Sequence, residues 1–248
     1  MKKLVVVPTY NERENIQPLI EAVLNVPGAF DILVVDDDSP DGTADMVLPY
    51  DMRTDRVRLM RRKGVRGLGR SYVDGFRYAV SHGYEAVFSM DADFSHKPAD
   101  LANLAEALKG HDVAVGSRYC GGCVSVENWP LRRLILSLCA GRYVRLVTGL
   151  KVCDPTSGFR GFRAVVLAAI GLDGIRSNGY SFQVETLYKA FRCGFGITEV
   201  PIIFTERRSG QSKMSKRVIL EAALMPWRLR LTRFHPSAHL TPSRSDLR

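Results

Sequence analysis

Strand-like and helix-like segments alternate through the first 117 residues, and this alternation constrains the fold more than any other feature of the chain. Apolar runs at 3–7 and 30–36 are typical of buried strands, whereas residues 12–25 and 98–110 carry apolar side chains at helical spacing. Strands that alternate with helices form a parallel sheet covered on both faces. The sequence therefore predicts an α/β fold with a Rossmann-like, mostly parallel sheet.

Acidic side chains gather where the predicted strands end. Asp91 and Asp93 close the run 85–90, and three consecutive aspartates, 36–38, close the run 30–36. The carboxyl ends of parallel strands share one edge, where ligands bind. Two neighbouring carboxylates repel each other unless a cation lies between them, and carboxylate oxygens suit a hard ion. The pattern predicts a Mg²⁺ or Mn²⁺ site at Asp91 and Asp93, completed by substrate phosphates.

Two cofactor classes are disfavoured. No Gly-rich turn follows the first strand, where the chain reads PTYNERENI, so a nicotinamide or flavin enzyme is not expected. Among five cysteines there is one C-x-x-C, at Cys120 and Cys123, without the second pair that a zinc site needs. We expect reduced thiols, as in cytosolic proteins.

Positive charge is concentrated late in the chain. The net charge is +9, and residues 207–248 hold ten Lys and Arg against two acids. Nucleic acid, a lipid surface or a phosphorylated substrate would each fit this asymmetry. Nucleic acid is disfavoured because Trp227 and Phe234 are the only aromatic residues after Phe204. We expect no signal peptide, and no apolar run reaches the roughly 18–20 residues of a membrane span.

Residues 131–149 form a predicted helix with a basic character. Its apolar stripe consists of Leu131, Leu134, Ile135, Leu138 and Cys139. Two interpretations remain open: a surface helix packed on the core, or an amphipathic helix at a membrane interface. A basic amphipathic helix is predicted over 218–234 and a disordered polar tail over 235–248.

Seven motifs together indicate a family. In order along the chain they are VVVPTYNERENI, VVDDDSPDGT, MDADFSH, GSRY, ENWPLRR, SGFRGF and RRSGQSKM. The set resembles family 2 glycosyltransferases of the GT-A fold, and more closely the dolichol-phosphate (polyprenol-phosphate) mannose synthases in their catalytic-domain-only form. The resemblance covers about residues 1–217, which are expected to form one GT-A domain. It implies inverting transfer of mannose from GDP-mannose to a polyprenyl monophosphate.

The resemblance also implies roles at the donor end of the site. Asp91 and Asp93 would bind the metal and the diphosphate. Ser95 stands where some relatives have a metal-ligating Gln, and it would be a third, weak metal ligand, acting through water. Met90 and Ala92 would line the site by main-chain contact. The remaining implied donor-binding residues are Pro8, Tyr10, Glu12, Val35, Asp37, Arg118, Arg207 and Lys213.

The resemblance also implies a set of cations at the phosphates. Arg118, Arg207 and Lys213 would meet phosphates of the donor or the acceptor and act in catalysis, with Lys213 at the departing diphosphate. The chemistry of the acceptor adds the expectation that Arg133 joins Arg118 and Arg207 on the lipid phosphate. The second pKa of a phosphate monoester is near 6, so the acceptor is largely a dianion at neutral pH and needs no general base. It needs cations, and Arg grips phosphate in a fork.

The expected setting is the cytoplasmic face of a membrane, with peripheral contact made by residues 131–149 and 213–234 or through a small membrane-protein partner. Two rivals stay open. One is transfer of glucose or N-acetylglucosamine from a UDP-sugar to the same lipid. The other is a nucleic-acid-binding protein with a vestigial transferase domain.

Overall fold

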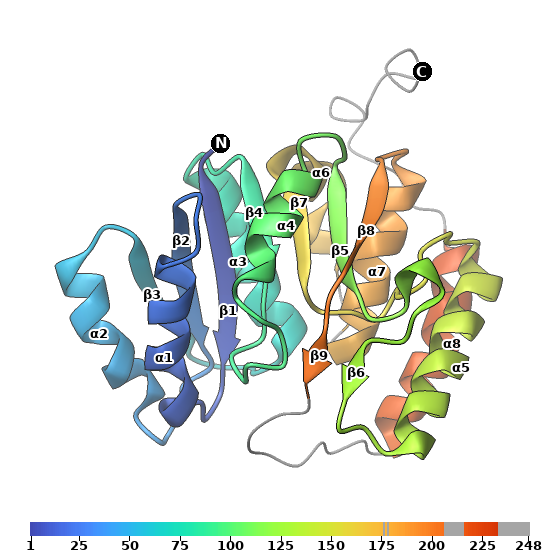
Figure 1. Ribbon diagram of the computed structural model, residues 1–248, viewed down its shortest axis with the longest axis horizontal. Coiled ribbons are helices and arrows are strands. Elements are labelled where there is room, and N and C mark those ends of the chain that lie inside the picture. Colours follow the sequence, from blue (N-terminus) through green and yellow to red (C-terminus); the bar gives the residue numbers. More distant parts are fainter. Residues whose placement is uncertain (176, 178, 206–215, 233–248) are drawn as a thin grey trace.

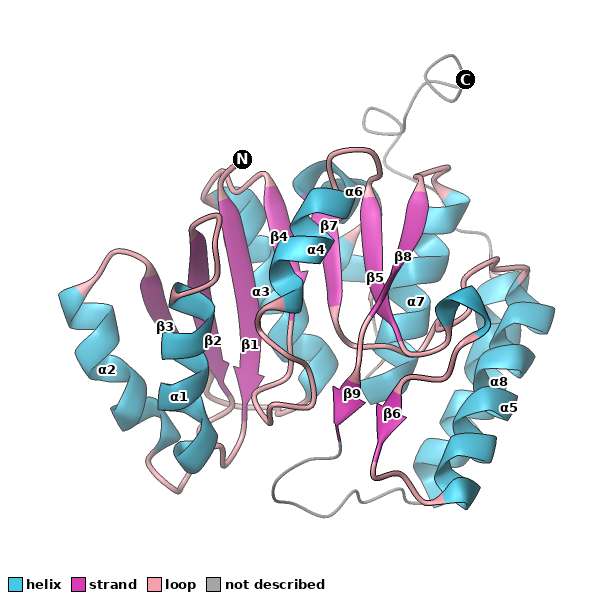
Figure 2. Ribbon diagram, viewed as in Figure 1, coloured by secondary structure: helices cyan, strands magenta, loops and turns pink. Residues whose placement is uncertain are grey.

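A seven-stranded sheet runs through the molecule (Figures 1 and 2). The computed structural model describes residues 1–175, 177, 179–205 and 216–232. The strand order across the sheet is β3-β2-β1-β4-β7-β5-β8. The strands are β1 (Lys3–Thr9), β2 (Phe30–Asp36), β3 (Val57–Arg61), β4 (Ala86–Ser89), β5 (Val113–Ser117), β7 (Arg160–Arg163) and β8 (Ile197–Pro201).

The sheet is mostly parallel, as predicted. β2 pairs with β1 and β3 in parallel, β1 with β4, and β5 with β8. β7 was not predicted; it lies antiparallel between β4 and β5 and joins the two halves of the sheet. The other strands therefore end at one edge, where the aspartates of the sequence collect.

Helices cover both faces of the sheet. α1 (Arg13–Leu24), α2 (Thr43–Arg53) and α4 (Asp100–Ala107) pack on one face through a buried cluster that includes Ile16, Val47 and Leu101. α3 (Leu68–Ser81), α6 (Ala164–Ala169) and α7 (Gly179–Arg192) cover the other face, where Phe76 and Phe182 are buried. The prediction of an α/β fold with helices on both faces is confirmed.

α5 (Leu131–Thr148) and α8 (Lys216–Leu231) run side by side beside the β5–β8 end of the sheet (Figure 1). β6 (Val126–Glu127) and β9 (Phe204–Thr205) form a separate parallel pair. Two short turns complete the fold: η1 (Cys120–Gly122), which has left-handed φ at Gly121, and the 3₁₀ turn η2 (Leu172–Gly174), which contacts α3. The helix predicted over 218–234 is observed as α8, and the predicted tail, 235–248, lies outside the described residues.

The apolar stripe predicted on α5 does not pack on the core. Leu131 is 71% exposed and Ile135 52%, and Leu138 and Cys139 are exposed as well. The helix buries Gly141, Val144, Val147 and Thr148 instead, all in its second half. The interpretation of this stripe as a core-facing surface is therefore wrong.

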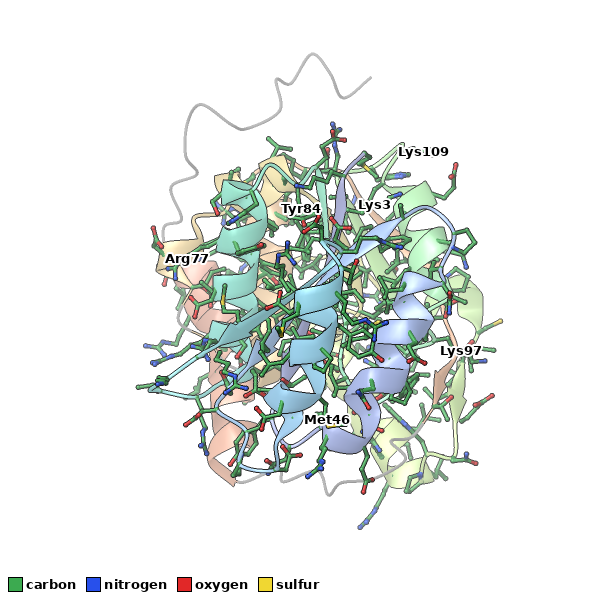
Figure 3. All side chains as sticks on the ribbon, turned by 90° about the vertical axis from the view of Figure 1, so that its left-hand side faces the viewer. Lys3, Met46, Arg77, Tyr84, Lys97 and Lys109 are labelled. Atoms are coloured by element: carbon green, nitrogen blue, oxygen red, sulfur yellow. The ribbon has the colours of Figure 1, made fainter. Side chains whose placement is uncertain are left out.

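At the opposite edge of the sheet, described side chains make contacts between the starts of strands. Lys3, Tyr84 and Lys109 lie there together, near the starts of β1, β4 and β5 (Figure 3). The hydroxyl of Tyr84 donates to Asp31 at 3.0 Å, and Lys2 lies over the Tyr84 ring. These contacts tie strand starts together and leave the functional residues to the carboxyl edge.

No helix in the described part of the chain combines the length and the apolar content that a membrane crossing requires.

Candidate active site

A cleft of ≈ 200 Å³ opens at the carboxyl edge of the sheet. Residues from the ends of β1 and β2, the start of α3 and the segment after β4 line it. They are Pro8, Thr9, Tyr10, Glu12, Asp37, Leu68, Ser71, Asp91, Ala92 and Asp93. Seven of these ten were predicted site residues, although they come from three separate motifs. The parallel sheet brings them together because its strands end at one edge.

The first carboxylate of the D-x-D segment is oriented by a buried tyrosine. The Tyr72 hydroxyl donates to Asp91 Oδ1 at 3.1 Å, and the Tyr72 ring stacks on Phe182 at 5.6 Å with an interplanar angle of 7°. Burial, reinforced by the charge of Asp91 and this hydrogen bond, raises the pKa of Tyr72 well above its usual value. The hydroxyl of Tyr72 therefore stays protonated and remains a hydrogen-bond donor to Asp91 at any physiological pH.

The second carboxylate is buried and ordered by its own loop. Asp93 is 5% exposed, and its Oδ1 accepts hydrogen bonds from the Ser95 backbone at 3.0 Å and from the Ser95 hydroxyl. Between them, Phe94 has a φ of 58°, a left-handed conformation that costs energy for a side chain of this size. The turn thus holds Asp93 rigidly, and Ser95 acts on it as a donor.

The oxygen set fits a hard divalent cation. Within the described ranges, no group of three His, Cys, Asp or Glu side chains converges on one point. Mg²⁺ and Mn²⁺ are commonly held by one or two carboxylates with substrate phosphates and water. Asp91 and Asp93 supply that pair of carboxylates, so a metal here would depend on the substrate for its remaining ligands.

Asp36, the last residue of β2, and Asp37, the next residue, have separate roles. Asp36 shapes the turn, since it accepts from Thr9 at 2.9 Å and from the backbone of Ser39 at 2.9 Å. Asp37 accepts from Ser71 and from the Gly67 backbone, each at 2.9 Å, and forms an ion pair with Arg62. Its carboxylate therefore fixes the loop that leads into α3, on the wall of the cleft.

At the mouth of the cleft an arginine covers Tyr10. Arg66 donates to the Tyr10 hydroxyl at 2.7 Å and to the Asp38 carbonyl at 3.2 Å, and its guanidinium lies 4.5 Å from the ring centroid. Tyr10 is 45% exposed and Asp38 has a φ of 57°, again left-handed. An exposed aromatic ring and a guanidinium fork at this rim are suited to contact a planar base.

Three predicted nucleotide-binding residues have side chains that are buried in the core or hydrogen-bonded within the protein. The side chains of Val35 and Met90 are fully buried in the core, so they can reach a ligand only through the main chain. The backbone of Glu12 donates to Thr43 at 2.9 Å, and its carboxylate accepts from Asn15 at 2.8 Å at the start of α1.

Arg118 is held by a carboxylate that the sequence analysis did not identify. Asp154 Oδ2 accepts from the Arg118 backbone and from Nε at 3.1 and 2.6 Å, and Oδ1 accepts from Nη2 at 2.7 Å. Burial opposes ionisation of Asp154, but the hydrogen bonds and charge of Arg118 prevail and lower the pKa of Asp154. The backbone amide of Asp154 in turn donates to Glu199 at 3.0 Å, which fixes the loop.

Two predicted phosphate-binding arginines meet at one indole ring. The guanidinium of Arg118 lies 5.5 Å from the Trp129 ring centroid, and that of Arg133, in the first turn of α5, lies 4.1 Å from it. The structure thus brings together residues from the GSRY and ENWPLRR motifs. Arg207 and Lys213 lie outside the described residues.

Besides the cleft-lining Thr9, Leu68 and Ser71, the sequence did not predict four residues that contact predicted site residues: Tyr72, Asp154, Trp129 and Arg66. Trp129 lies within a quoted motif and Asp154 lies three residues before the SGFRGF motif, which was a usable signal. Tyr72 and Arg66 are separated in sequence from the residues they contact, so no local pattern marks them.

The chain was compared with known proteins. The model of the family Glycosyl transferase family 2 matches residues 4–171. The polyprenol monophosphomannose synthase of Mycolicibacterium smegmatis is 45% identical over 89% of this chain and 84% of that protein. The undecaprenyl-phosphate mannosyltransferase of Micrococcus luteus is 41% identical over 90% of this chain and 92% of that protein.

Solved structures agree on the fold. Glucosyl-3-phosphoglycerate synthase from Mycobacterium tuberculosis, crystallised with Mn²⁺, UDP-glucose and phosphoglyceric acid, superimposes with a TM-score of 0.66 at 20% identity, covering 94% of this chain and 81% of that one. This likeness supports the predicted GT-A fold. The predictions of the family and of an enzyme are confirmed as well: the chain is a glycosyltransferase and belongs to glycosyl transferase family 2.

Proposed function

We propose that this enzyme transfers mannose from GDP-mannose to a polyprenyl monophosphate, with inversion at the anomeric carbon. The relatives named as polyprenol and undecaprenyl-phosphate mannosyltransferases support the sugar and the acceptor class. One structural observation supports a phosphate acceptor. The guanidinium groups of Arg118 and Arg133 both lie against the Trp129 ring, beside the exposed side chains of α5.

The proposed reaction needs no general base. A phosphate oxygen of the lipid attacks C1 of mannose from the face opposite the diphosphate. The bond from C1 to the diphosphate oxygen breaks, and its electron pair leaves with GDP. A metal held by Asp91 and Asp93 would neutralise charge on the departing diphosphate. The main electrostatic obstacle is the repulsion between the lipid phosphate and the donor diphosphate, which are both anionic. Arg118 and Arg133 would hold the lipid phosphate close to the donor against this repulsion.

The acceptor's lipid tail suggests a membrane surface, and α5 and α8 provide a suitable one. We call these helices and their exposed apolar side chains the α5/α8 surface: Leu131, Ile135, Leu136, Leu138, Leu146, Leu224, Trp227 and Leu231. The pair is fixed by hydrogen bonds from Tyr143 to the Ala223 carbonyl at 2.5 Å and from Arg230 to the Val147 carbonyl at 3.2 Å. Arg132, Arg142 and Arg145 are exposed on α5, where an anionic lipid surface would attract them.

Transfer of label tests the reaction. Purified enzyme would be incubated with radiolabelled GDP-mannose, a polyprenyl phosphate and Mg²⁺ or Mn²⁺, and label in the organic phase would be counted. We expect metal-dependent label that Asp93→Ala abolishes. Label from UDP-glucose instead of GDP-mannose would replace the proposed donor. Loss of label with Arg133→Ala at low acceptor concentration, recovered at high concentration, would support its role on the acceptor phosphate.

Vesicle binding tests the α5/α8 surface separately. We expect co-sedimentation with phosphatidylglycerol vesicles that weakens as salt rises. Leu136→Glu, on α5, should weaken it further. Met52→Glu, which places the same charge at an 85% exposed position on α2, is the matched control and should bind like the wild type. Equal binding by both variants would contradict the assignment of this surface.

A further inference from the structure

The C-G-G-C segment of residues 120–123 forms a closed turn that the proposed reaction does not use. Gly121 has a φ of 66° and Gly122 of 75°, and the Cys123 amide donates to the Cys120 carbonyl at 3.3 Å. Positive φ at both central residues is the geometry of a type I′ turn, and it favours glycine at both positions. Such a turn holds its first and last Cα atoms less than about 7 Å apart, and disulfides bridge Cα atoms about 4.4–6.8 Å apart.

The two thiols are unequally accessible. Cys123 is exposed, whereas Cys120 is half-buried. Burial, and next the charge of Glu199, raise the pKa of Cys120, so this thiol is the weaker initial nucleophile. An exposed attacking cysteine beside a shielded second one is the arrangement needed for a two-step exchange.

We propose that Cys120 and Cys123 are a redox-active dithiol that closes to a disulfide within the turn by exchange with a small-molecule disulfide such as oxidised glutathione. Cys123, as thiolate, attacks one sulfur of the small disulfide and releases one thiol. Cys120 then loses its proton, attacks the Cys123 sulfur and releases the second thiol. Two electrons pass from the cysteine pair to the small disulfide, which leaves as two thiols.

The turn lies on the segment that joins Arg118 to α5. The Ser125 amide donates to the Arg118 carbonyl at 2.9 Å and closes the loop around the cysteines. The turn is already formed, and the Arg118 side chain is held by Asp154 from another segment. The dithiol inference stands independently of the sugar and acceptor proposed above.

Tryptic mapping after redox equilibration tests the proposal. The full-length protein would be equilibrated in reduced and oxidised glutathione, quenched with acid, alkylated and digested. Cleavage after Arg118 and Arg132 gives a peptide, 119–132, that contains Cys120 and Cys123 and no other cysteine. We expect this peptide to lose two hydrogens as its two thiols form a disulfide. The midpoint potential of this oxidation should lie between about −250 and −180 mV, a range that glutathione mixtures span. Cys139, on its own peptide, should remain alkylated.

Gly121→Ala isolates the role of the turn. A Cβ at this position would have nothing within 4 Å, so only the backbone preference changes. Ala is strained at this φ, so the reduced variant relaxes out of the turn, and closing the disulfide must restore the strained conformation. We therefore expect the equilibrium constant for disulfide closure to fall roughly tenfold, a shift of about 30 mV for a two-electron couple. Three results would overturn the proposal: a peptide that stays reduced in the most oxidising mixture, glutathione retained on Cys123 without closure, or a cross-link from 119–132 to the Cys153 peptide, 152–160.

Discussion

Replacing Asp154 by Asn tests whether the buried ion pair of Arg118 and Asp154 holds together the side of the site where we propose that the acceptor binds. The carboxylate accepts three hydrogen bonds from Arg118, and the two side chains are 7% and 0% exposed for Arg118 and Asp154. Asn has the same shape but no charge, and it must turn an NH₂ donor towards a guanidinium that only donates. The variant therefore leaves a buried cation without its counter-charge.

The expected loss can be bounded from the surroundings of the cation. Removing one partner of a buried ion pair costs about 3–5 kcal/mol. Three aromatic rings, Tyr119, Trp129 and Phe204, remain 5.2–5.5 Å from the guanidinium carbon and stabilise the unpaired charge in part. We therefore expect the free energy of unfolding to fall by about 3 kcal/mol, the lower end of that range.

The sign of the pH dependence follows from the pKa of Asp154, which is lowered in the folded protein. A carboxyl with a depressed pKa in the folded state contributes stability above its unfolded pKa, about 3.9 for Asp. That contribution is lost as pH falls through the folded pKa. The difference between wild type and Asp154→Asn should thus be full at neutral pH and shrink in acid.

Urea unfolding followed by circular dichroism measures this loss. Asp173→Asn is the matched control, since its ion pair with Arg77 is exposed, with Asp173 91% accessible, and its loss should cost less than about 1 kcal/mol. Removing both partners, with Arg118→Met and Asp154→Leu, should cost less than Asp154→Asn alone. A loss below about 1 kcal/mol for Asp154→Asn, equal to the control, would refute the reasoning.

Three further outcomes are expected. Tyr72→Phe should lower the affinity for Mn²⁺ by roughly tenfold, because Asp91 loses the hydrogen-bond donor that orients it. Electron paramagnetic resonance with GDP present measures this affinity, and the urea midpoint of unfolding should change little. Gly75→Ala should destabilise the fold by about 1–3 kcal/mol in urea unfolding, because its Cβ would overlap the Val6 side chain. Arg66→Ala should weaken GDP binding in calorimetry by roughly tenfold and UDP binding less, because an Arg fork matches the O6 and N7 acceptors of guanine.

The sequence predicted the features that local patterns determine. Alternating strands and helices fixed the layers of the fold, and the position of Asp37, Asp91 and Asp93 after buried runs placed them at one edge. The cleft then follows from topology alone, because parallel strands end together. The same reasoning could not find β7, since Arg160–Arg163 is four residues long and its position depends on pairing with β4 and β5.

Contacts between distant segments were beyond the sequence. Arg118 and Asp154 are 36 residues apart, and Tyr72 and Asp91 are 19 apart. Such pairs arise where the tertiary fold brings two elements together, and no periodicity records them. The stripe on α5 was found by its spacing, but spacing cannot say whether an apolar face meets the core or remains exposed.

The exposed helix and the acceptor arginine are linked by the way α5 packs. A Cβ at Gly141 would lie 3.6 Å from the Cys153 carbonyl and 3.7 Å from the Pro155 ring, so the second half of α5 rests on the loop that carries Asp154. The first turn of the same helix places Arg133 on Trp129, which also faces Arg118. A displacement of α5 would therefore act on Arg118 from two sides, through the carboxylate of Asp154 and through the ring of Trp129. If the α5/α8 surface binds lipid and α5 moves, the positions of Arg118 and Arg133, the cations proposed to bind the lipid phosphate, would change with it.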